Sequence, residues 1–328
     1  AQLALAGNAP KGTVLVLAGD TPMLTGEALT QFVAAHAAGK FAASVLTAEH
    51  PDPTGYGRIV RGDDGAIVAI VEERDASDDL KAIDEINTGV YLFDTQTLKE
   101  SVKKLKSNNS QGELYLTDVI AEIKNGGGKT AAILSLDYTE TLGINDRTQL
   151  AESAAIMRDR INDGHMRVGV TITDPTTTWI DVTVKIENDV TIHPGSWLIG
   201  KTSIAKNSVI GPRSTLKDVV VKESAHIFES NVSESEIGCC ANVGPYSFIR
   251  PGTKVADNAK VGAYVEVKNS KIGEGSKVPH LSYVGDAEIG SGTNIGAATI
   301  FVNYDGVEKH ETKIGNDVRI GSDTMLVA

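Results

Sequence analysis

The chain has 328 residues, enough for two domains, with 31 Lys and Arg against 43 Asp and Glu and a formal net charge of −12. This negative balance argues against a surface that binds nucleic acid or an anionic membrane, although a local basic patch can still hold phosphates. There is no apolar run that could span a bilayer, no signal-peptide pattern, and only two cysteines, the adjacent Cys239 and Cys240, so we expect a cytoplasmic protein.

The first elements of the chain have the order strand, helix, strand. Residues 13–18 are a continuous apolar run, typical of a buried parallel strand, and helical spacing predicts a helix from residue 25 to about residue 38. Residues 42–47 are the next strand, so we expect a largely parallel sheet covered by helices. Asp20 lies at the carboxyl end of the first strand, where such sheets bind ligands. It is either a Mg²⁺ ligand or the cap of a turn before Pro22, and the spacing leaves both open.

A loop and a hairpin follow. Residues 52–59 contain Gly55 and Gly57, which let backbone N–H groups approach a ligand, although a single glycine-rich loop is a weak signal. Residues 59–61 and 66–72 predict a hairpin around an Asp-Asp-Gly turn.

The remainder of this domain predicts one more strand and one more helix. Residues 85–89 lead into a strand at 90–93, and residues 113–124 have an amphipathic helical pattern. The run Gly126-Gly127-Gly128-Lys129-Thr130 is interpreted as the turn that ends this helix, because a P-loop needs a glycine where Ile123 stands.

A helix that begins at Asn145-Asp146 is expected to join the two domains. Its predicted apolar face consists of Leu150, Ala154, Met157 and Ile161. Asn145 is either the N-cap of this helix or a metal ligand that faces a nucleotide site.

Residues 184–326 repeat an aliphatic residue every six positions. The repeat runs from Ile186 to Leu216, resumes at Ile237 after an irregular patch, and returns in shifted register as far as Leu326. An α-helix would spread such a repeat around all its faces, whereas a coil of three short strands keeps each aliphatic residue inside. We therefore expect a β-helix of roughly eight stacked coils.

The residues alone thus predict an α/β domain with a parallel or mixed sheet, followed by a β-helix of hexapeptide repeats. The expected boundaries are 1–145 for the first domain, 146–165 for the linker helix and 166–328 for the β-helix.

Twelve motifs together resemble one enzyme family. They are Gly19-Asp20-Thr21-Pro22, residues 52–59, Ile70-Val71-Glu72, residues 85–89, residues 114–118, residues 143–147, Ile249-Arg250-Pro251-Gly252, Val265-Glu266-Val267-Lys268, His280-Leu281-Ser282-Tyr283, residues 294–297, residues 303–306 and residues 321–324. Their order and spacing resemble the bifunctional bacterial enzyme that makes UDP-N-acetylglucosamine. The resemblance covers essentially the whole chain. It implies the fold class of an incomplete α/β nucleotidyltransferase-type domain followed by a left-handed β-helix of hexapeptide repeats.

The resemblance implies two activities. One is Mg²⁺-dependent uridylyl transfer from UTP to N-acetylglucosamine 1-phosphate, and the other is acetyl transfer from acetyl-CoA to glucosamine 1-phosphate on the left-handed β-helix. It also implies a homotrimer whose acetyltransferase sites lie between subunits, so that a lone chain is inactive. The pathway implied by the resemblance is the synthesis of UDP-N-acetylglucosamine, which is used to make peptidoglycan and so maintains cell shape.

For acetyl transfer, the resemblance implies that His280 is the general base that accepts the proton of the attacking amine. The residues matched to the sugar phosphate and sugar are Arg250, Lys268, Tyr283 and Asn294. Those matched to acetyl-CoA, to the reacting amine or to the neighbouring subunit are Ala297, Asn303, Tyr304, Lys309 and Ser322.

For uridylyl transfer, the resemblance implies that Asp20 and Asn145 are Mg²⁺ ligands. Contacts to UDP-N-acetylglucosamine are implied for Gly57, Glu72, Asn87 and Asn145.

The chain departs from the family at both ends. The glycine-rich loop Leu-x-x-Gly-x-Gly-Thr-Arg-Met and a downstream Lys, which hold the nucleotide in the family, are absent. We therefore expect weak or no uridylyl transfer and a first domain that lacks core strands. The last coils and tail are also absent, so we expect weaker acetyl-CoA binding. Ala298 and Phe301-Val302 differ from many relatives near the cofactor, without a predicted effect.

Three alternatives stay open. The first is a sugar nucleotidyltransferase whose β-helix only oligomerises or regulates, against which the break at residues 280–283 argues. The second is a metal-dependent enzyme of the carbonic-anhydrase type, which needs clustered histidines; this half has His193, His226, His280 and His310 without a His-x₄-His pair. The third is a non-catalytic assembly module.

Overall fold

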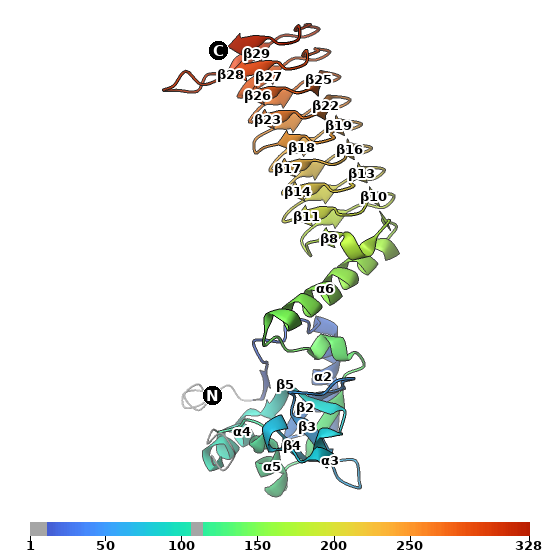
Figure 1. Ribbon diagram of the computed structural model, residues 1–328. Helices are drawn as coiled ribbons and strands as arrows, with labels where there is room; N and C mark the ends of the chain where they lie inside the picture. Colours follow the sequence, from blue (N-terminus) through green and yellow to red (C-terminus); the bar gives the residue numbers. More distant parts are fainter. Residues whose placement is uncertain (1–11, 106–113) are drawn as a thin grey trace. The chain divides into compact units, whose positions relative to one another are not determined.

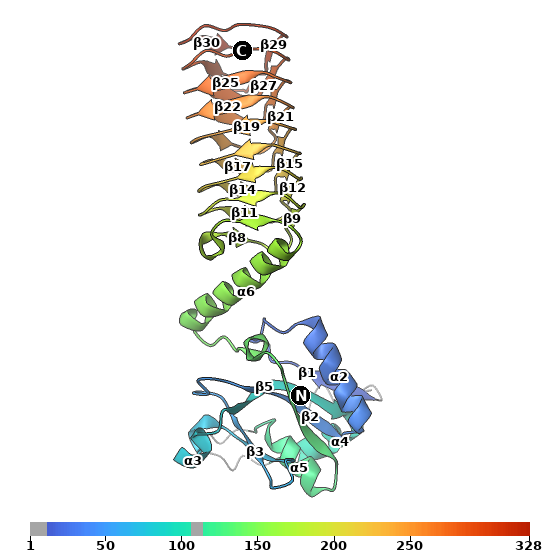
Figure 2. The same ribbon diagram turned by 90° about the vertical axis from the view of Figure 1, so that its right-hand side faces the viewer.

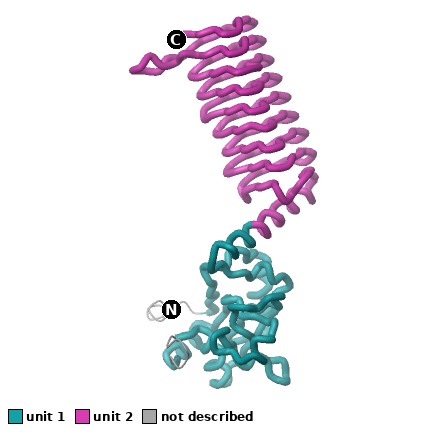
Figure 3. Tube along the Cα trace, in the orientation of Figure 1, with its two compact units in different colours: residues 1–154 teal, residues 155–328 magenta. Residues whose placement is uncertain are grey.

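The computed structural model describes residues 12–105 and 114–328. The chain divides into two compact units, residues 1–154 (unit 1) and residues 155–328 (unit 2) (Figure 3). Helix α6 (Arg147–Arg167) contains the division between them. The expected boundaries at 145 and 165, which assign this helix to a separate linker, stay a prediction.

Unit 1 contains a six-stranded mixed sheet. The strands follow the path β4-β3-β5-β2-β6, and β1 pairs with β5. Strand β5 is antiparallel to β1, β2 and β3, whereas β2 and β6 are parallel. The bounds are β1 (Thr13–Val16), β2 (Ala43–Glu49), β3 (Arg58–Arg61), β4 (Ile67–Val71), β5 (Glu85–Asp94) and β6 (Thr130–Leu134).

The prediction that residues 13–18 form a buried strand with a parallel neighbour is wrong. Strand β1 is shorter, its residues are exposed or half-buried, and its described neighbour is the antiparallel β5. The reason is that β5 enters the sheet between β1 and β2, so these two strands run the same way without touching. The apolar run indicated a strand but not which strand would lie beside it.

Helices cover both faces of this sheet. Helix α2 (Gly26–Gly39) packs Phe32 against Leu46, Val90 and Leu92. On the opposite face, α4 (Thr95–Ser101) and α5 (Asp118–Asn125) pack against a second cluster that includes Val45. Successive strand residues point to opposite faces, so one strand supplies both cores. The shorter helices of unit 1 are α3 (Asp78–Lys81), η1 (Glu73–Asp75), η2 (Val102–Lys104) and η3 (Tyr138–Thr141).

Two local predictions are corrected and one is confirmed. Residues 114–117 are not helical and residue 113 lies outside the described residues, so α5 begins at Asp118. Residues 85–89 are part of β5 rather than a loop before it. As predicted, Gly126–Gly128 end α5, with N–H groups bonded to its last carbonyls. Thr25 is the N-cap of α2, because its side-chain oxygen accepts a hydrogen bond from the Ala28 N–H (3.1 Å).

Unit 2 is a parallel β-helix of three sheets (Figures 1 and 2). The His280 sheet contains β7 (Thr171–Ile172), β10 (Thr191–Ile192), β13 (Val209–Ile210), β16 (His226–Ile227), β19 (Asn242–Val243), β22 (Lys260–Ala263) and β25 (Lys277–His280). The Tyr283 sheet contains β8 (Trp179–Ile180), β11 (Trp197–Ile199), β14 (Thr215–Lys217), β17 (Asn231–Ser233), β20 (Phe248–Ile249), β23 (Glu266–Lys268), β26 (Tyr283–Gly285), β28 (Ile300–Val302) and β30 (Met325–Val327). The Lys271 sheet contains β9 (Lys185–Ile186), β12 (Ser203–Ile204), β15 (Val220–Val221), β18 (Glu236–Ile237), β21 (Lys254–Val255), β24 (Lys271–Ile272), β27 (Ala287–Ile289) and β29 (Thr312–Ile314). A short helix, η4 (Pro175–Thr177), precedes β8.

The aliphatic repeat forms the core of unit 2, as predicted. Leu198 lies over Leu216 and Val243 over Val261, and all four are fully buried. The expectation that the repeat is interrupted before Ile237 is wrong, because Val221, Ile227 and Val232 continue the same core. Some sides of these coils are five residues long instead of six, which shifts the repeat without breaking the stack.

The last turns of α6 lie against the first coils. Ile161 and Met166 pack on the β-helix core, whereas Leu150 of the predicted apolar face is 52% exposed. Only part of the predicted face is therefore used for packing. No described helix is long and apolar enough to cross a membrane.

Candidate functional site

A pocket in unit 1 brings together all five residues predicted for the nucleotide half. It has a volume of about 210 Å³ and opens beside the carboxyl end of β1. The five predicted residues that line it are Asp20, Gly57, Glu72, Asn87 and Asn145.

Backbone hydrogen bonding holds Asp20 and Asn145 on the same side of this pocket. The Ile144 N–H donates to the Asp20 carbonyl oxygen (2.9 Å), which ties the loop after β1 to the segment before α6. Asp20 Oδ2 and Asn145 Nδ2 each lie 4.0 Å from the position that a Cβ on Gly143 would occupy. One carboxylate and one side-chain amide therefore flank the same glycine.

The alternative reading of Asn145 as a helix cap is excluded. Asp146 has that role, because its Oδ1 accepts a hydrogen bond from the Gln149 N–H (2.8 Å). The Asn145 side chain is left at the pocket wall. Among the described residues, no cluster of three or more His, Cys, Asp or Glu side chains is close enough to hold a metal ion.

Gly57, Glu72 and Asn87 form the opposite wall. The Asn87 N–H donates to the Gly57 carbonyl oxygen (2.8 Å), and a Cβ on Gly57 would lie 3.3 Å from Glu72 Oε2. Asn87 Oδ1 accepts hydrogen bonds from the Gly89 N–H and the Tyr91 hydroxyl, so its NH₂ group is the part that remains for a ligand. Burial raises the pKa of Glu72, and nearby Asp118 and Asp75 raise it further.

Arg58 supports this wall, although the sequence predicted no role for it. Its side chain is 2% exposed, and its guanidinium lies 2.8 Å from Glu73 Oε2. The same group donates to the carbonyl oxygens of Tyr56 and Lys81. An arginine at the start of a hairpin strand is usually solvated, so no sequence signal distinguished it.

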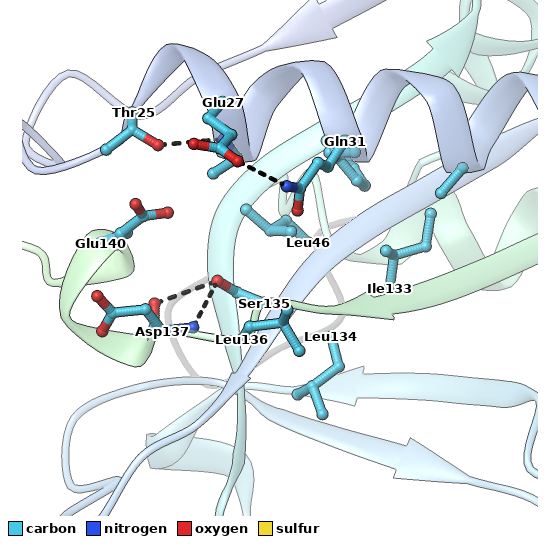
Figure 4. A pocket seen from close by; sticks show the side chains of 13 residues that line it. Thr25, Glu27, Gln31, Leu46, Ile133, Leu134, Ser135, Leu136, Asp137 and Glu140 are labelled. Carbon is cyan, nitrogen blue, oxygen red and sulfur yellow. Dashed lines mark hydrogen bonds between the residues drawn. The ribbon is translucent and has the colours of Figure 1, made fainter.

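A second pocket in unit 1 contains none of the predicted residues. It measures about 390 Å³ and lies between α2, the end of β6 and η3 (Figure 4). Phe32, Leu46 and Ile133 form its apolar part, and Glu27 and Glu140 lie at its edge.

In unit 2, three predicted residues occupy equivalent positions on successive coils. The Ala298 N–H donates to the His280 carbonyl oxygen (3.3 Å), and the Asp323 N–H donates to the Ala297 carbonyl oxygen (2.9 Å). His280, Ala297 and Ser322 therefore lie along one corner, and the His280 side chain is exposed to solvent.

Four more predicted residues lie on the Tyr283 sheet, which meets the His280 sheet at this corner. Lys268 lies in register with Gly285. A Cβ on Gly285 would lie 2.7 Å from Asn303 Nδ2 and would overlap the Tyr283 hydroxyl, so both groups are held above this glycine. Arg250, one coil before Lys268, forms an ion pair with Glu266 (2.8 Å).

Residues 303–311 leave the stack as a hairpin between β28 and β29 (Figure 1). Tyr304 pairs with Lys309 across it, and Asp305 Oδ2 lies 2.8 Å from His310 Nε2. A hydrogen bond with Lys268 and the charge of that residue lower the pKa of Lys309.

Asn294 is the predicted residue that lies apart. It continues the His280 sheet between Lys277 and Arg319, and no described hydrogen bond joins it to Lys268, Tyr283 or Asn303.

An exposed apolar ridge follows the corner that carries His280. Tyr246, Tyr264 and Leu281 occupy it on successive coils and are 52%, 61% and 58% exposed. The two tyrosine rings stack with centroids 5.1 Å apart. All three residues have positive φ, between +52° and +58°, which is uncommon for large side chains.

Comparisons with known proteins match both units. A profile of the nucleotidyl transferase family matches residues 1–183. The bifunctional protein GlmU of Corynebacterium diphtheriae is 52% identical over 318 residues, which are 97% of this chain and 66% of that protein. The GlmU proteins of Streptomyces coelicolor and Brevibacillus brevis are 51% and 49% identical over 98% and 97% of this chain and 67% and 69% of their own lengths.

The chain thus spans about two thirds of the length of these curated relatives. The resemblance seen in the sequence motifs is confirmed, as is the fold class of a nucleotidyltransferase domain followed by a β-helix. The chain belongs to the GlmU family of bifunctional transferases.

Proposed function

We propose that unit 2 transfers the acetyl group of acetyl-CoA to the amine of glucosamine 1-phosphate. The observation that carries the proposal is the corner at which the column of His280, Ala297 and Ser322 meets Lys268, Tyr283 and Asn303. A β-helix needs only inward aliphatic residues to fold, so polar groups gathered at one corner point to a ligand.

In this proposal His280 accepts a proton from the amine as the nitrogen attacks the thioester carbonyl carbon. The carbonyl oxygen gains negative charge, which the Ser322 hydroxyl or a backbone N–H at Ala297 can stabilise. Collapse of the tetrahedral intermediate expels the thiolate of coenzyme A. Lys268 and Arg250 supply positive charge for the sugar phosphate.

The test is thiol release from acetyl-CoA with glucosamine 1-phosphate, with glucosamine as the control that lacks the phosphate. Release that depends on the phosphate supports the proposal. Thermal stabilisation by acetyl-CoA without any thiol release would instead favour the alternative of a β-helix that binds but does not react.

For unit 1 we propose uridylyl transfer from UTP to N-acetylglucosamine 1-phosphate. The sugar phosphate oxygen attacks the α-phosphorus of UTP and pyrophosphate leaves. Glu72, the Asn87 amide and the backbone at Gly57 would contact the sugar, which agrees with their position on one wall of the pocket.

Mg²⁺ fits the donors at the other wall, because a carboxylate and an amide oxygen are both hard ligands. Asp20 and Asn145 would hold the ion, and phosphate oxygens and water would complete its coordination. The ion would offset the charge of the phosphates. Mn²⁺ binding measured by electron paramagnetic resonance with UDP-N-acetylglucosamine tests this: Asp20→Asn should abolish it and Asp52→Asn, at an exposed position that does not line the pocket, should not. Equal binding by both variants would remove Asp20 from the site.

We also propose that the chain assembles as a cytoplasmic homotrimer through the ridge of Tyr246, Tyr264 and Leu281. Contiguous exposed apolar side chains of this kind mark interaction surfaces. Sedimentation equilibrium of the parent and of Tyr264→Asp tests the assembly, and a parent that sediments as a monomer would overturn it.

A further inference from the structure

Asp286 lies in the turn between β26 and β27, at the edge of the Tyr283 sheet. Its φ is +48°, its N–H donates to the Lys268 carbonyl oxygen (3.0 Å), and its own carbonyl oxygen accepts from the Thr312 N–H (3.1 Å). The backbone is therefore held between two neighbouring coils. The side chain is 14% exposed.

Both carboxylate oxygens of Asp286 are engaged. Oδ1 accepts a hydrogen bond from Asn269 Nδ2 (2.7 Å), and Oδ2 accepts one from Asn303 Nδ2 (2.5 Å). Lys268 Nζ lies 3.9 Å from Oδ2. Burial alone would raise the pKa of Asp286, but the two amide hydrogen bonds and the charge of Lys268 outweigh it, so the pKa is lowered and the group is an anion.

This contact determines the orientation of the Asn303 amide. A carboxylate accepts hydrogen bonds only, so the NH₂ group of Asn303 must face Asp286. The amide oxygen then faces away from Asp286 as an acceptor. Asn303 is 7% exposed, so its side chain has little freedom to turn over.

Asp286 is also the counter-charge of two close lysines. Lys268 and Lys309 lie close enough that Lys268 lowers the pKa of Lys309, whereas Asp286 and Tyr283 raise it. Glu266, another carboxylate of the Tyr283 sheet, is paired with Arg250. Without Asp286, the two lysines would repel each other with no anion between them until a ligand arrives.

We propose that Asp286 is a positioning residue of the acetyl-transfer site: it holds the Asn303 amide oxygen toward the substrate and places a carboxylate beside Lys268 and Lys309, which bind the phosphate of glucosamine 1-phosphate. The inference rests on the proposed acetyl transfer. It requires no contact between Asp286 and either substrate.

The test compares Asp286→Asn with Asp218→Asn. Asp218 is a matched control, because it occupies an equivalent turn with φ +54° and accepts a hydrogen bond from the Lys201 N–H, several coils from the site. For Asp286→Asn we expect KM for glucosamine 1-phosphate to rise about tenfold, while KM for acetyl-CoA stays within about twofold, because one charge-assisted contact is lost at the sugar side only.

The pH dependence distinguishes positioning from folding. Removal of the carboxylate lowers the pKa of Lys309 further, so the alkaline rise in KM for glucosamine 1-phosphate should begin at lower pH in Asp286→Asn. Asp286→Glu keeps the charge and should restore the parent pH dependence even if its longer side chain leaves KM raised. A similar loss for both substrates with an unchanged pH profile would overturn the proposal.

Calorimetry separates this inference from the proposed function. A parent chain that releases no thiol would overturn the proposed acetyl transfer. Binding of glucosamine 1-phosphate can still be measured on that chain, and equal affinity of the parent and Asp286→Asn would overturn the role of Asp286.

Discussion

The guanidinium of Arg58 forms a salt bridge with the carboxylate of Glu73 at 2.8 Å, although the hairpin β3–β4 separates the two residues in the chain. Arg58 also bonds to backbone carbonyls on both sides of this pair. The loop that carries Gly57 and the strand end that carries Glu72 are therefore held by one buried cation.

Arg58→Ala should destabilise unit 1 by about 3 kcal/mol, because removal of one partner leaves Glu73 and two carbonyl oxygens without their donor. Both tryptophans of the chain, Trp179 and Trp197, are in unit 2. In urea unfolding, Arg58→Ala should therefore lower the urea concentration at which unit 1 unfolds, measured by circular dichroism. The transition of unit 2, measured by tryptophan fluorescence, should be the same as in the parent. Arg74→Ala, at an exposed neighbouring position, is the control, and an equal effect of both substitutions would contradict the prediction.

His280→Ala should lower kcat for acetyl transfer by about two or more orders of magnitude, since that is the usual contribution of a general base. His226, an exposed histidine on the same sheet, provides the control His226→Ala. Steady-state thiol release measures both. A His280→Ala variant within about threefold of the parent would remove His280 from the mechanism.

Gly285→Ala should damage the Tyr283 sheet, because the added methyl group would lie 2.7 Å from Asn303 Nδ2 and would overlap the Tyr283 hydroxyl. Overpacking of this kind costs about 1–3 kcal/mol. We expect a lower melting temperature and a higher KM for glucosamine 1-phosphate. At Gly315 a methyl group would meet only Val318 at 3.9 Å, so Gly315→Ala should change neither quantity. Loss of stability in both variants alike would count against the steric account.

Glu72→Gln should stabilise unit 1 at neutral pH. Folding raises the pKa of Glu72 by burial, so the ionised side chain disfavours the folded state at pH values above that raised pKa. Stability should fall as pH rises from the ordinary glutamate range through the raised value, and the variant should escape this loss. Below the ordinary range, parent and variant should melt alike.

Melting temperature against pH measures this effect, with Glu49→Gln at an exposed strand end as the control. Glu72→Gln should also weaken binding of an N-acetylglucosamine phosphate, because it removes the carboxylate proposed to contact the sugar. Functional carboxylates are often retained although they lower stability. A Glu72→Gln variant that melts lower than the parent at neutral pH would show that hydrogen bonds to Glu72 outweigh its burial.

The sequence by itself determined the architecture of unit 2. An inward aliphatic residue must recur once per side of a three-sided coil, so a repeat of six has few other structural solutions. It also determined a local feature, the turn at Gly126 that ends α5, because this turn depends on residues close in the chain. The motifs, through their family resemblance, predicted a site of Asp20, Gly57, Glu72, Asn87 and Asn145, and these five residues line one pocket.

The tertiary structure decided which residues meet. It placed β5 between β1 and β2, buried Arg58 against Glu73, and gave the helix cap to Asp146 instead of Asn145. In unit 2 it brought Asp286 to Asn303 and Lys268 to Lys309. The contacts in unit 1 depend on the order of the strands. The contacts in unit 2 depend on the register between coils, which is set by the number of five-residue and six-residue sides and by the hairpin at 303–311. Such long-range pairings follow from the packing of the whole unit, and no local pattern of residues contains them.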